Sequence, residues 1–552
     1  GAKNLTIMDL DDDNLGANST QLGAGVGSDY ALRMQAGNAT IQMDDEAYTL
    51  YVGDTSGADV VDLRAAATGK ELKLRLGNEA DPQGVGGVEI RSAGYISGDG
   101  LDATTGGSLS LTGRVSQGGT LHATTGDTIT LIGPSADITI SGVDTRAANV
   151  TLSPGVGSDI IFADTAVFTV NAGGGQPGNL TMENADGILM ESDGGAGPDA
   201  SIVLDGNLLV QNVATFTMED GTSITANGSA SISATGAIAL EDISVDANND
   251  GDDDQLPVAG TPAVLNVTST NGTIALNGLL DGGTNNTTTS LITADADNSG
   301  TGQITDGNAA SLNADNIKDL TLVAGSNIGL ADGIEGTVSR FSAQSAAGSI
   351  WYANTGGFEI ANVNGIDGVS VVGGATPFIR VLAASPLTVN APVSNAGGGN
   401  IDLAADGNAA ADDLTINANV TATGGTGNIN LYAGDTVNVN NAGVVVSAAG
   451  TGAVLLSAGT DYNGGGALAN GTNAGQILMT SGSQITSQDG NITLRAPGDI
   501  LQLSVINADS NTDATDGAVT ITADYDGVGT GLSNNTGAIV DNLAGEPANN
   551  IV

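Results

Sequence analysis

Oxygen-bearing side chains at alternate positions of one short segment are the strongest candidate for chemistry in this 552-residue chain. The segment VDANNDGDDDQ carries carboxylates and amides at this spacing, and Gly251 permits a sharp reversal of the backbone. Such a pattern is typical of the first half of a calcium-binding loop. Pro257 stands where an EF-hand has its bidentate Glu, so a solvated insertion between strands is the competing interpretation. The candidate Ca²⁺ ligands are Asp246, Asn248, Asp250, Asp252 and Asp254.

A second acidic segment follows the same spacing, with candidate ligands Asp295, Asp297 and, at the twelfth position, Asp306. A related phrase at Asp524 and Asp526 lacks an acid at its twelfth position, so a shared turn design is the competing interpretation. Residues 194–199 resemble a single nonapeptide of a calcium-binding β-roll, and one copy indicates a turn. Ca²⁺ is the one cofactor that we expect, because cysteine is absent and a single His excludes a multi-histidine centre.

Residue types give little support to catalysis. Every nucleophile–base–acid triad would have to use His122, the basic residues number 13, and aromatic residues make up 3% of the chain. Trp351, the one Trp, is interpreted as packing between repeats. Paired Asp residues occur in many turns and carry little specificity. We therefore expect no enzyme. The alternative is a polysaccharide-binding or polysaccharide-cleaving β-helix, which would show one groove with clustered acids and a base.

Short alternating segments must position these side chains. A Gly followed by a small or polar residue and then an apolar–polar–apolar triplet recurs along the chain, and period-two alternation indicates a strand with one buried face. No long stretch shows a 3.6-residue apolar period, so few or no helices are expected. The phrase recurs as GTIAL at Gly272, GNIDL at Gly399, GNINL at Gly427, GNITL at Gly490 and GAVTI at Gly517, with Gly452 and Gly475 taken as equivalent glycines.

A near-repeat sets the expected architecture. LDATTGGSLSLTG at Leu101 returns as LHATTGDTITLIG at Leu121, and this step suits one coil of a solenoid and is far shorter than a sandwich module. The sequence therefore predicts an all-β fold, a right-handed parallel β-helix (β-solenoid) of roughly 20–28 residues per coil. Residues 1–100 fit the repeat less well and are expected to form an irregular β region continuous with the solenoid. Residues 101–552 form the β-helix itself, with a loop insertion near 246–262.

From about residue 100 to 540, the Gly-Asn-Ile-Thr-Leu phrases and the Thr-Ala-Asp-x-Asp-x-x-Gly-Thr-Gly turn resemble the filamentous-haemagglutinin-like and autotransporter-passenger class of giant bacterial surface proteins. This resemblance implies a parallel β-helix that is extracellular or at the cell surface. With the scarcity of catalytic residue types, it favours a non-enzymatic structural protein, a fibre or adhesin stalk with Ca²⁺ at acidic turns.

Charge and strand pattern indicate the partners. The formal net charge of −49 repels phosphate backbones, so we expect no nucleic-acid partner. No apolar run approaches the roughly 18 residues of a membrane span, so no direct membrane insertion is expected. Strand-like segments near both ends predict self-association end to end, or stacking on further repeats of the same polypeptide. Cell-surface glycans are a further candidate partner.

Overall fold

The computed structural model is all-β in the residues that it describes, which confirms the expected fold class. It describes side chains for residues 150–523, except 154–156, 158, 171–177, 196–197, 246–261, 284–287, 298–299, 308–311, 408–410, 461, 463–474, 502–504 and 511–516. Outside that range it describes the backbone of the strands up to β16 (Asn149–Ser153) and of β58 (Ile539–Asp541). The expected loop insertion near 246–262 therefore lies almost wholly outside the described residues, as does the side chain of His122.

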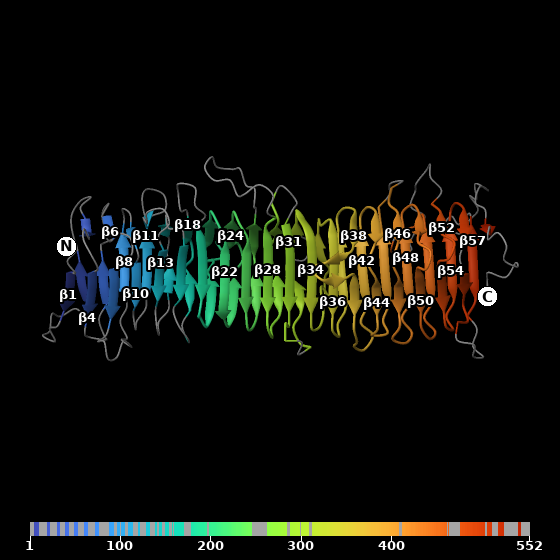
Figure 1. The fold of residues 1–552 in the computed structure, drawn as a ribbon, viewed down its shortest axis with the longest axis horizontal. Coiled ribbons are helices and arrows are strands. Elements are labelled where there is room, and N and C mark those ends of the chain that lie inside the picture. Colours follow the sequence, from blue (N-terminus) through green and yellow to red (C-terminus); the bar gives the residue numbers. More distant parts are fainter. Residues whose placement is uncertain are drawn as a thin grey trace. The chain divides into compact units, whose positions relative to one another are not determined.

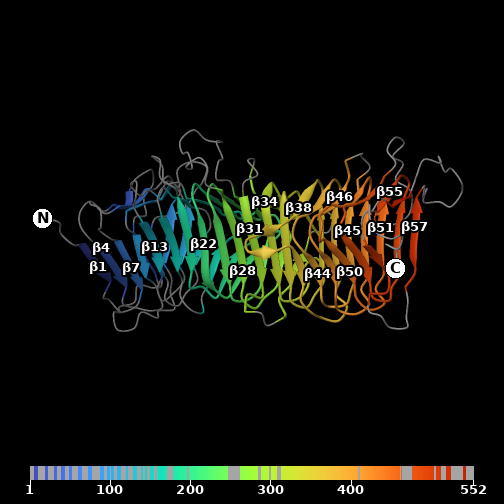
Figure 2. The same ribbon diagram turned by 45° about the vertical axis from the view of Figure 1, so that its right-hand side comes forward.

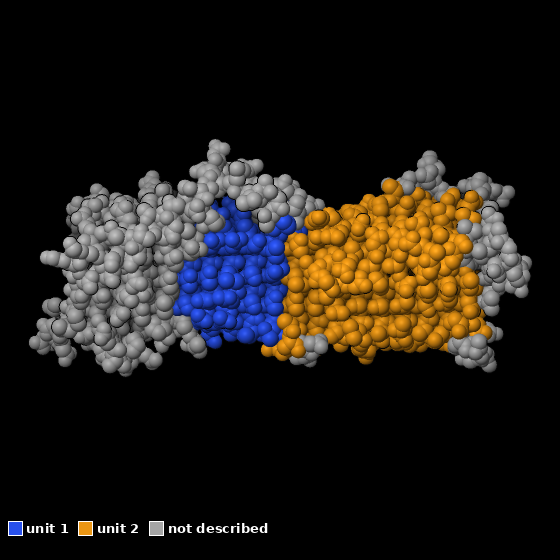
Figure 3. All heavy atoms as spheres, viewed as in Figure 1, with its two compact units in different colours: residues 1–270, 275–288 blue, residues 271–274, 289–552 orange. Residues whose placement is uncertain are grey.

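The chain divides into two compact units, coloured separately in Figure 3. Unit 1 comprises Gly1–Thr270 and Ala275–Thr288, and unit 2 comprises Asn271–Ile274 and Thr289–Val552. Within each unit, successive coils lay their strands side by side in chain order (Figure 1). Three strands, β29 (Ile274–Leu276), β31 (Thr288–Ala294) and β32 (Ile304–Asp306), lie at or just after the division in the sequence.

Unit 1 is a stack of coils whose strands pair in parallel with those of the next coil. Its first ladder contains β1 (Leu5–Asp9), β4 (Ala39–Met43), β7 (Leu72–Leu76), β10 (Leu101–Thr104), β13 (Thr128–Ile132), β16, β19 (Asn179–Glu183), β22 (Leu208–Val213), β25 (Ala230–Ala234) and β28 (Val264–Ser269). Its second contains β2 (Ser19–Leu22), β5 (Thr49–Val52), β8 (Val88–Ser92), β11 (Leu109–Gly113), β14 (Ile138–Ile140), β17 (Ile160–Phe162), β20 (Gly187–Met190), β23 (Thr215–Met218) and β26 (Ile238–Leu240). A third side carries β3 (Tyr30–Arg33), β6 (Val60–Arg64) and β9 (Ile96–Asp99), and then β12 (Thr120–Leu121), β15 (Val143–Thr145), β18 (Val167–Val170), β21 (Ser201–Leu204), β24 (Ser223–Ala226), β27 (Asp242–Val245) and β30 (Leu280–Asp281).

Unit 2 is built in the same way, and Figure 2 shows its ladders obliquely. The β37 ladder contains β33 (Ala314–Asp315), β35 (Ile334–Gly336), β37 (Ile350–Asn354), β42 (Ile379–Ala383), β45 (Ile401–Ala405), β48 (Ile429–Ala433), β51 (Val454–Ala458), β54 (Ile492–Ala496) and β57 (Val519–Ala523). The β38 ladder contains β38 (Phe358–Ile360), β43 (Leu387–Val389), β46 (Leu414–Ile416), β49 (Val437–Val439), β52 (Ile477–Met479), β55 (Ile500–Gln502) and β58. The β41 ladder contains β41 (Val369–Val371), β44 (Val393–Asn395), β47 (Val420–Ala422), β50 (Val445–Ala448), β53 (Gln484–Ser487) and β56 (Val505–Asn507).

The side chains alternate between a buried and an outward face, as the period-two pattern predicts. In β48, Ile429, Leu431 and Ala433 are buried, whereas Asn430 and Tyr432 point outward. The same pattern recurs along the β37 ladder, so aliphatic side chains of successive coils stack into one core per unit. Burying each Ile or Leu contributes about 1.5–3 kcal/mol. The outward positions are thereby left free for polar contacts or for binding.

Register fixes the length of a coil. Leu320 pairs with Phe341, whereas Val454 pairs with Ile492, so the later coil holds nearly twice as much chain as the earlier one. The expected value of roughly 20–28 residues per coil therefore fits the earlier coil and is too small for the later one, because the corners differ in length. The echo between Leu101 and Leu121 does not measure a coil at its own position. Leu109 of β11 pairs with Ile138 of β14 and not with its sequence equivalent in β13, because β11 and β13 belong to different ladders. Two similar strands on different sides of the solenoid produce the echo.

The glycines of the recurrent phrase form a stack in unit 2. A Cβ on Gly427 would collide with the carbonyl oxygen of Gly399, and the same relation joins Gly452 to Gly427, Gly490 to Gly452 and Gly517 to Gly490. Coils can approach to strand-pairing distance at this corner only without a side chain. Gly475 is not part of this stack. It precedes β52, which pairs with β49 in another ladder.

The Asn that follows these glycines binds the next coil. Asn400 Oδ1 accepts a hydrogen bond from the Asn428 backbone N–H at 3.0 Å, and Asn428 Oδ1 accepts one from Ala453 at 2.8 Å. Asn491 Oδ1 accepts one from Ala518 at 2.9 Å. Backbone donors at a corner have no ladder partner, so the Asn side chain supplies one.

The sides of the coil are reassigned around β36 (Arg340–Ser345) in unit 2. β34 (Ile317–Ala324) pairs with β36, whose first residues then pair with β38 and whose last residues pair with β41. The hairpin of β39 (Asn362–Val363) and β40 (Ile366–Asp367) is antiparallel and connects those two ladders. Three buried rings fill the core here: Phe341 stacks on Tyr352 at 4.1 Å between centroids, and Phe358 meets both edge-on. The ladder of β34 and β36 thus continues as two ladders, and the three buried rings fill the core where it divides.

Candidate functional site

The first group of predicted calcium ligands cannot be placed, because Asp246, Asn248, Asp250, Asp252 and Asp254 lie outside the described residues. Calcium at this segment stays a prediction.

Asp295 and Asp297 shape a turn. Asp295 has a left-handed backbone (φ 71°), is buried, and its Oδ2 accepts a hydrogen bond from Gly300 N at 2.5 Å. Asp297 Oδ1 lies 3.0 Å from the amide of Asn271, which donates to it in the orientation that satisfies both groups. Among the described side chains, neither Asp295 nor Asp297 belongs to a group of three possible metal ligands whose ligand atoms lie within 4.8 Å of one another.

Asp306 lies elsewhere, in what we call the Glu335 group: Asp306, Asp332 and Glu335. Ligand oxygens of the three carboxylates lie within 4.8 Å of one another. The buried Asn313 holds two members in place, since its Nδ2 donates to Asp306 Oδ1 and its Oδ1 accepts from Glu335 N, both at 3.0 Å. The structure therefore separates Asp306 from Asp295 and Asp297, and adds two residues that the loop spacing did not select.

Burial and like charges raise the proton affinity of this group. The pKa of Glu335 rises to about 7, mainly because burial penalises the charged carboxylate and secondarily because Asp306 and Asp332 repel it. Glu335 Oε2 is buried and has no hydrogen-bond partner among the described residues. Three carboxylates with one raised pKa can share a proton, or give three of the oxygen ligands that Ca²⁺ takes, with water supplying the others.

A second acidic group in unit 1, the Asp164 group, consists of Asp164, Asp193 and Asp199. Its oxygens also lie within 4.8 Å of one another, and Ser192 Oγ donates to Asp199 Oδ1 at 2.8 Å. Asp164 Oδ1 is buried without a hydrogen-bond partner among the described residues. Sequence reasoning interpreted residues 194–199 as a turn and missed this group, because Asp164 comes from the preceding coil.

The outward face of the β37 ladder carries a cluster of rings around Arg380, which we call the Arg380 patch. It consists of Trp351, Phe378, Arg380, Asp402, Tyr432 and Tyr462. Register brings it together: Trp351 pairs with Arg380, and Arg380 pairs with Asp402, at the same outward position of β37, β42 and β45. The guanidinium carbon lies 5.0 Å from the Trp351 ring and 5.2 Å from the ring of Tyr462. Trp351 was expected to pack between repeats, and its ring does lie against Gly333 of the preceding coil, but it also stays partly exposed on the outward face.

The indole of Trp351 also lies against a glycine of the preceding turn. A Cβ on Gly333 would come within 2.8 Å of Trp351 Nε1. Gly333 follows Asp332 of the Glu335 group. The acidic group and the Arg380 patch are therefore neighbours on one side of unit 2, and together they are the candidate functional site.

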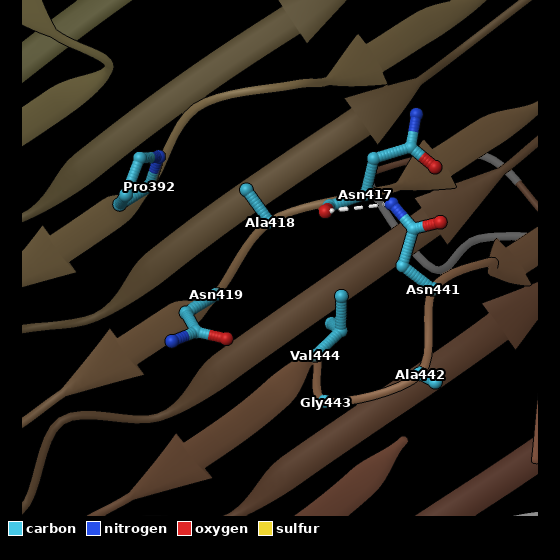
Figure 4. A pocket seen from close by; sticks show the side chains of 8 residues that line it. All are labelled: Pro392, Asn417, Ala418, Asn419, Asn441, Ala442, Gly443 and Val444. Carbon is cyan, nitrogen blue, oxygen red and sulfur yellow. Dashed lines mark hydrogen bonds between the residues drawn. The ribbon is translucent and has the colours of Figure 1, made fainter. Parts of the chain in front are cut away.

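Unit 2 also has a hollow of about 640 Å³ between turns, shown in Figure 4. The polar side chains that line it already form hydrogen bonds between successive coils. Asn441 Nδ2 donates to Asn417 O at 3.0 Å, and Asn419 Oδ1 accepts from Val445 N at 2.9 Å. The lining residues are Pro392, Asn417, Ala418, Asn419, Asn441, Ala442, Gly443 and Val444, none of which is an acid, a base or a nucleophile.

Among the residues with a described structure, no helix has the length and apolar character needed to cross a membrane. Comparison of the chain with protein-family models, with curated proteins and with solved structures finds no match.

Proposed function

We propose that this chain is a non-enzymatic structural protein, a β-solenoid fibre or adhesin stalk that is secreted or held at the cell surface. The observation that carries the proposal is the role of the recurrent residues. Gly427 and its equivalents allow one coil to approach the next, and Asn428 and its equivalents cap the backbone of the next coil. The most repeated residues of unit 2 thus serve stacking, which is the property that a stalk requires.

Calcium at acidic turns belongs to this proposal. The Glu335 group and the Asp164 group offer oxygen ligands only, which suits a hard cation such as Ca²⁺. Bound Ca²⁺ would offset the mutual repulsion of the carboxylates and raise the melting temperature of the chain. Chelation would then lower it.

Location gives the direct test. Antibodies raised against the folded chain should label intact cells of the source organism, and protease added outside should remove the label. Retention of the whole chain inside protease-treated cells would refute the proposal.

A second candidate function, cleavage of a polysaccharide, is favoured by one observation. Glu335 has a pKa of about 7 and lies beside Asp306 and Asp332, and a protonated carboxyl next to a carboxylate is the arrangement that glycoside hydrolysis uses. The measurement is the release of reducing ends from polysaccharides by the purified chain. Activity that disappears in Glu335→Gln and persists in Glu359→Gln, a change at an exposed Glu of unit 2, would replace the stalk with an enzyme.

A further inference from the structure

The distribution of rings in this chain is uneven. Ten aromatic residues lie between residues 150 and 523. Six are buried in the core: Phe162, Phe168, Phe216, Phe341, Tyr352 and Phe358. The other four, Trp351, Phe378, Tyr432 and Tyr462, all belong to the Arg380 patch and are half-buried. Every ring that the described side chains leave partly open to solvent therefore lies in one place.

The rings surround a cation. The guanidinium carbon of Arg380 is 5.0–5.2 Å from the ring centroids of Trp351, Phe378 and Tyr462, within the range of cation–π attraction. Tyr432 meets Tyr462 edge-on at 5.7 Å between centroids. The stacking fixes the rings in position and reduces the rotamer entropy that they would lose on binding a ligand.

Hydrogen-bonding groups lie among the rings. Asp402 accepts from the Tyr462 hydroxyl at 3.0 Å and from Asn430 Nδ2 at 2.8 Å, and it lies 3.6 Å from Arg380 Nη2. Burial and the nearby Asp402 raise the pKa of Tyr462 to about 12, so its hydroxyl keeps its proton at neutral pH. The Arg380 side chain is 28% exposed, and a guanidinium has five N–H donors. Asp402 itself is buried, so it holds Arg380 and Tyr462 in place, and the patch offers ring faces together with the guanidinium donors.

We propose that the Arg380 patch binds a neutral glycan. A pyranose has an apolar C–H face that stacks on a ring and a rim of hydroxyls that accept hydrogen bonds, and the fixed rings and the partly exposed Arg380 guanidinium complement both features. The inference rests on the proposed function and deepens it, since it names what the stalk holds.

The negative charge around the patch favours a neutral ligand over an acidic one. Asp402 lies within the patch, and Asp332 of the Glu335 group is next in sequence to Gly333, against which Trp351 packs. Arg380 is already neutralised in part by Asp402, and the chain as a whole carries −49. A polyanion would therefore be repelled from this side of unit 2.

The single Trp of the chain reports on the patch directly. The full chain is titrated with maltohexaose, cellohexaose and mannohexaose, and with hexagalacturonate as the acidic comparison, while Trp351 emission and heat release are recorded. At least one neutral hexasaccharide should shift the emission and saturate. Tyr432→Ala and Arg380→Gln should weaken its binding by about five- to tenfold each. Val203→Ala, which trims an exposed apolar side chain of unit 1, should leave it unchanged.

Several results would overturn the inference: no response to any neutral hexasaccharide at millimolar concentration, tighter binding of hexagalacturonate, or binding unaffected by both patch variants. The melting temperatures of the variants show whether a loss of binding comes from a loss of folding. Tyr432→Phe, which keeps the ring, should retain most of the affinity. Mass spectrometry of the recovered sugar separates the two proposals. Shortened chains would refute the non-enzymatic stalk while leaving the binding site intact, whereas failure of binding leaves the stalk standing.

Discussion

Replacing Gly427 by Ala tests the glycine stack. Gly427 lies outside the left-handed φ range, so the new methyl group meets steric resistance only, from the Gly399 carbonyl oxygen of the preceding coil. Relief of the collision requires the two coils to separate locally. The nearest bonds to lengthen are Asn428 N to Asn400 Oδ1, at 3.0 Å, and Ile401 N to Asn428 O, at 2.8 Å.

The magnitude follows from these contacts. Inserting a methyl group where no space exists costs about 1–3 kcal/mol, and weakening two hydrogen bonds adds about 0.5–1.5 kcal/mol each at most. We expect Gly427→Ala to lower the free energy of unfolding of unit 2 by about 2–6 kcal/mol, read as a shift of the urea midpoint at an unchanged m-value. The collision stays within unit 2, so the loss should appear in the transition that reports Trp351 emission.

Gly356→Ala is the matched control. Gly356 also lies in unit 2, has an ordinary φ, and a Cβ there meets nothing within 4 Å. Its substitution should change stability by no more than about 0.5 kcal/mol, or raise it slightly by restricting the unfolded chain. Equal costs for the two variants would refute the claim that the glycine stack sets the approach of the coils.

Three further predictions concern unit 2. The pKa of Glu335 is raised from 4.5 to about 7, so its contribution to stability is fully present below pH 4.5 and is lost as the pH rises through 7. In urea unfolding at pH 8, the free energy of unfolding of Glu335→Gln should therefore exceed that of the wild type by about 1–2 kcal/mol, after allowance for partial exposure. Near pH 4 the two free energies should be equal. Asn428→Ala leaves the N–H of Ala453 without its acceptor and should cost about 0.5–1.5 kcal/mol with faster hydrogen exchange at Ala453, whereas Asn428→Asp should retain most of the protection. Phe341→Leu removes the ring stacked on Tyr352 and should cost about 1–3 kcal/mol in thermal unfolding; a change below about 0.5 kcal/mol would show that neighbouring side chains refill the space.

The fold class follows from the sequence because its signals are local. Alternation in a phrase such as GNINL at Gly427 already specifies which side chains are buried, and Gly and Asn mark the corners. Register is a different matter, because it depends on how much chain each corner contains. The echo between Leu101 and Leu121 does not correspond to the pairing of one coil with the next, and Gly475 was wrongly taken as equivalent to the stacked glycines.

The candidate site depends on register and was predicted only in part. Asp306 was selected as the twelfth position of a loop, yet its acidic neighbours, Asp332 and Glu335, come from the following coil. Likewise, Trp351, Arg380 and Asp402 become neighbours only through pairing across three strands. The scarcity of Trp and Arg was visible from composition. Their convergence depends on two coils of unequal length, which only the register reveals.

The coil that joins Leu320 to Phe341 is short, and the coil that joins Val454 to Ile492 is long. Such a chain can therefore gain residues during evolution without losing its fold. Extra residues enter at a corner, and the strands on either side still pair with the next coil. Insertions are therefore accepted without repacking the aliphatic core, so corners can be lengthened independently of one another. The same freedom makes these corners suitable places to graft foreign peptides for display.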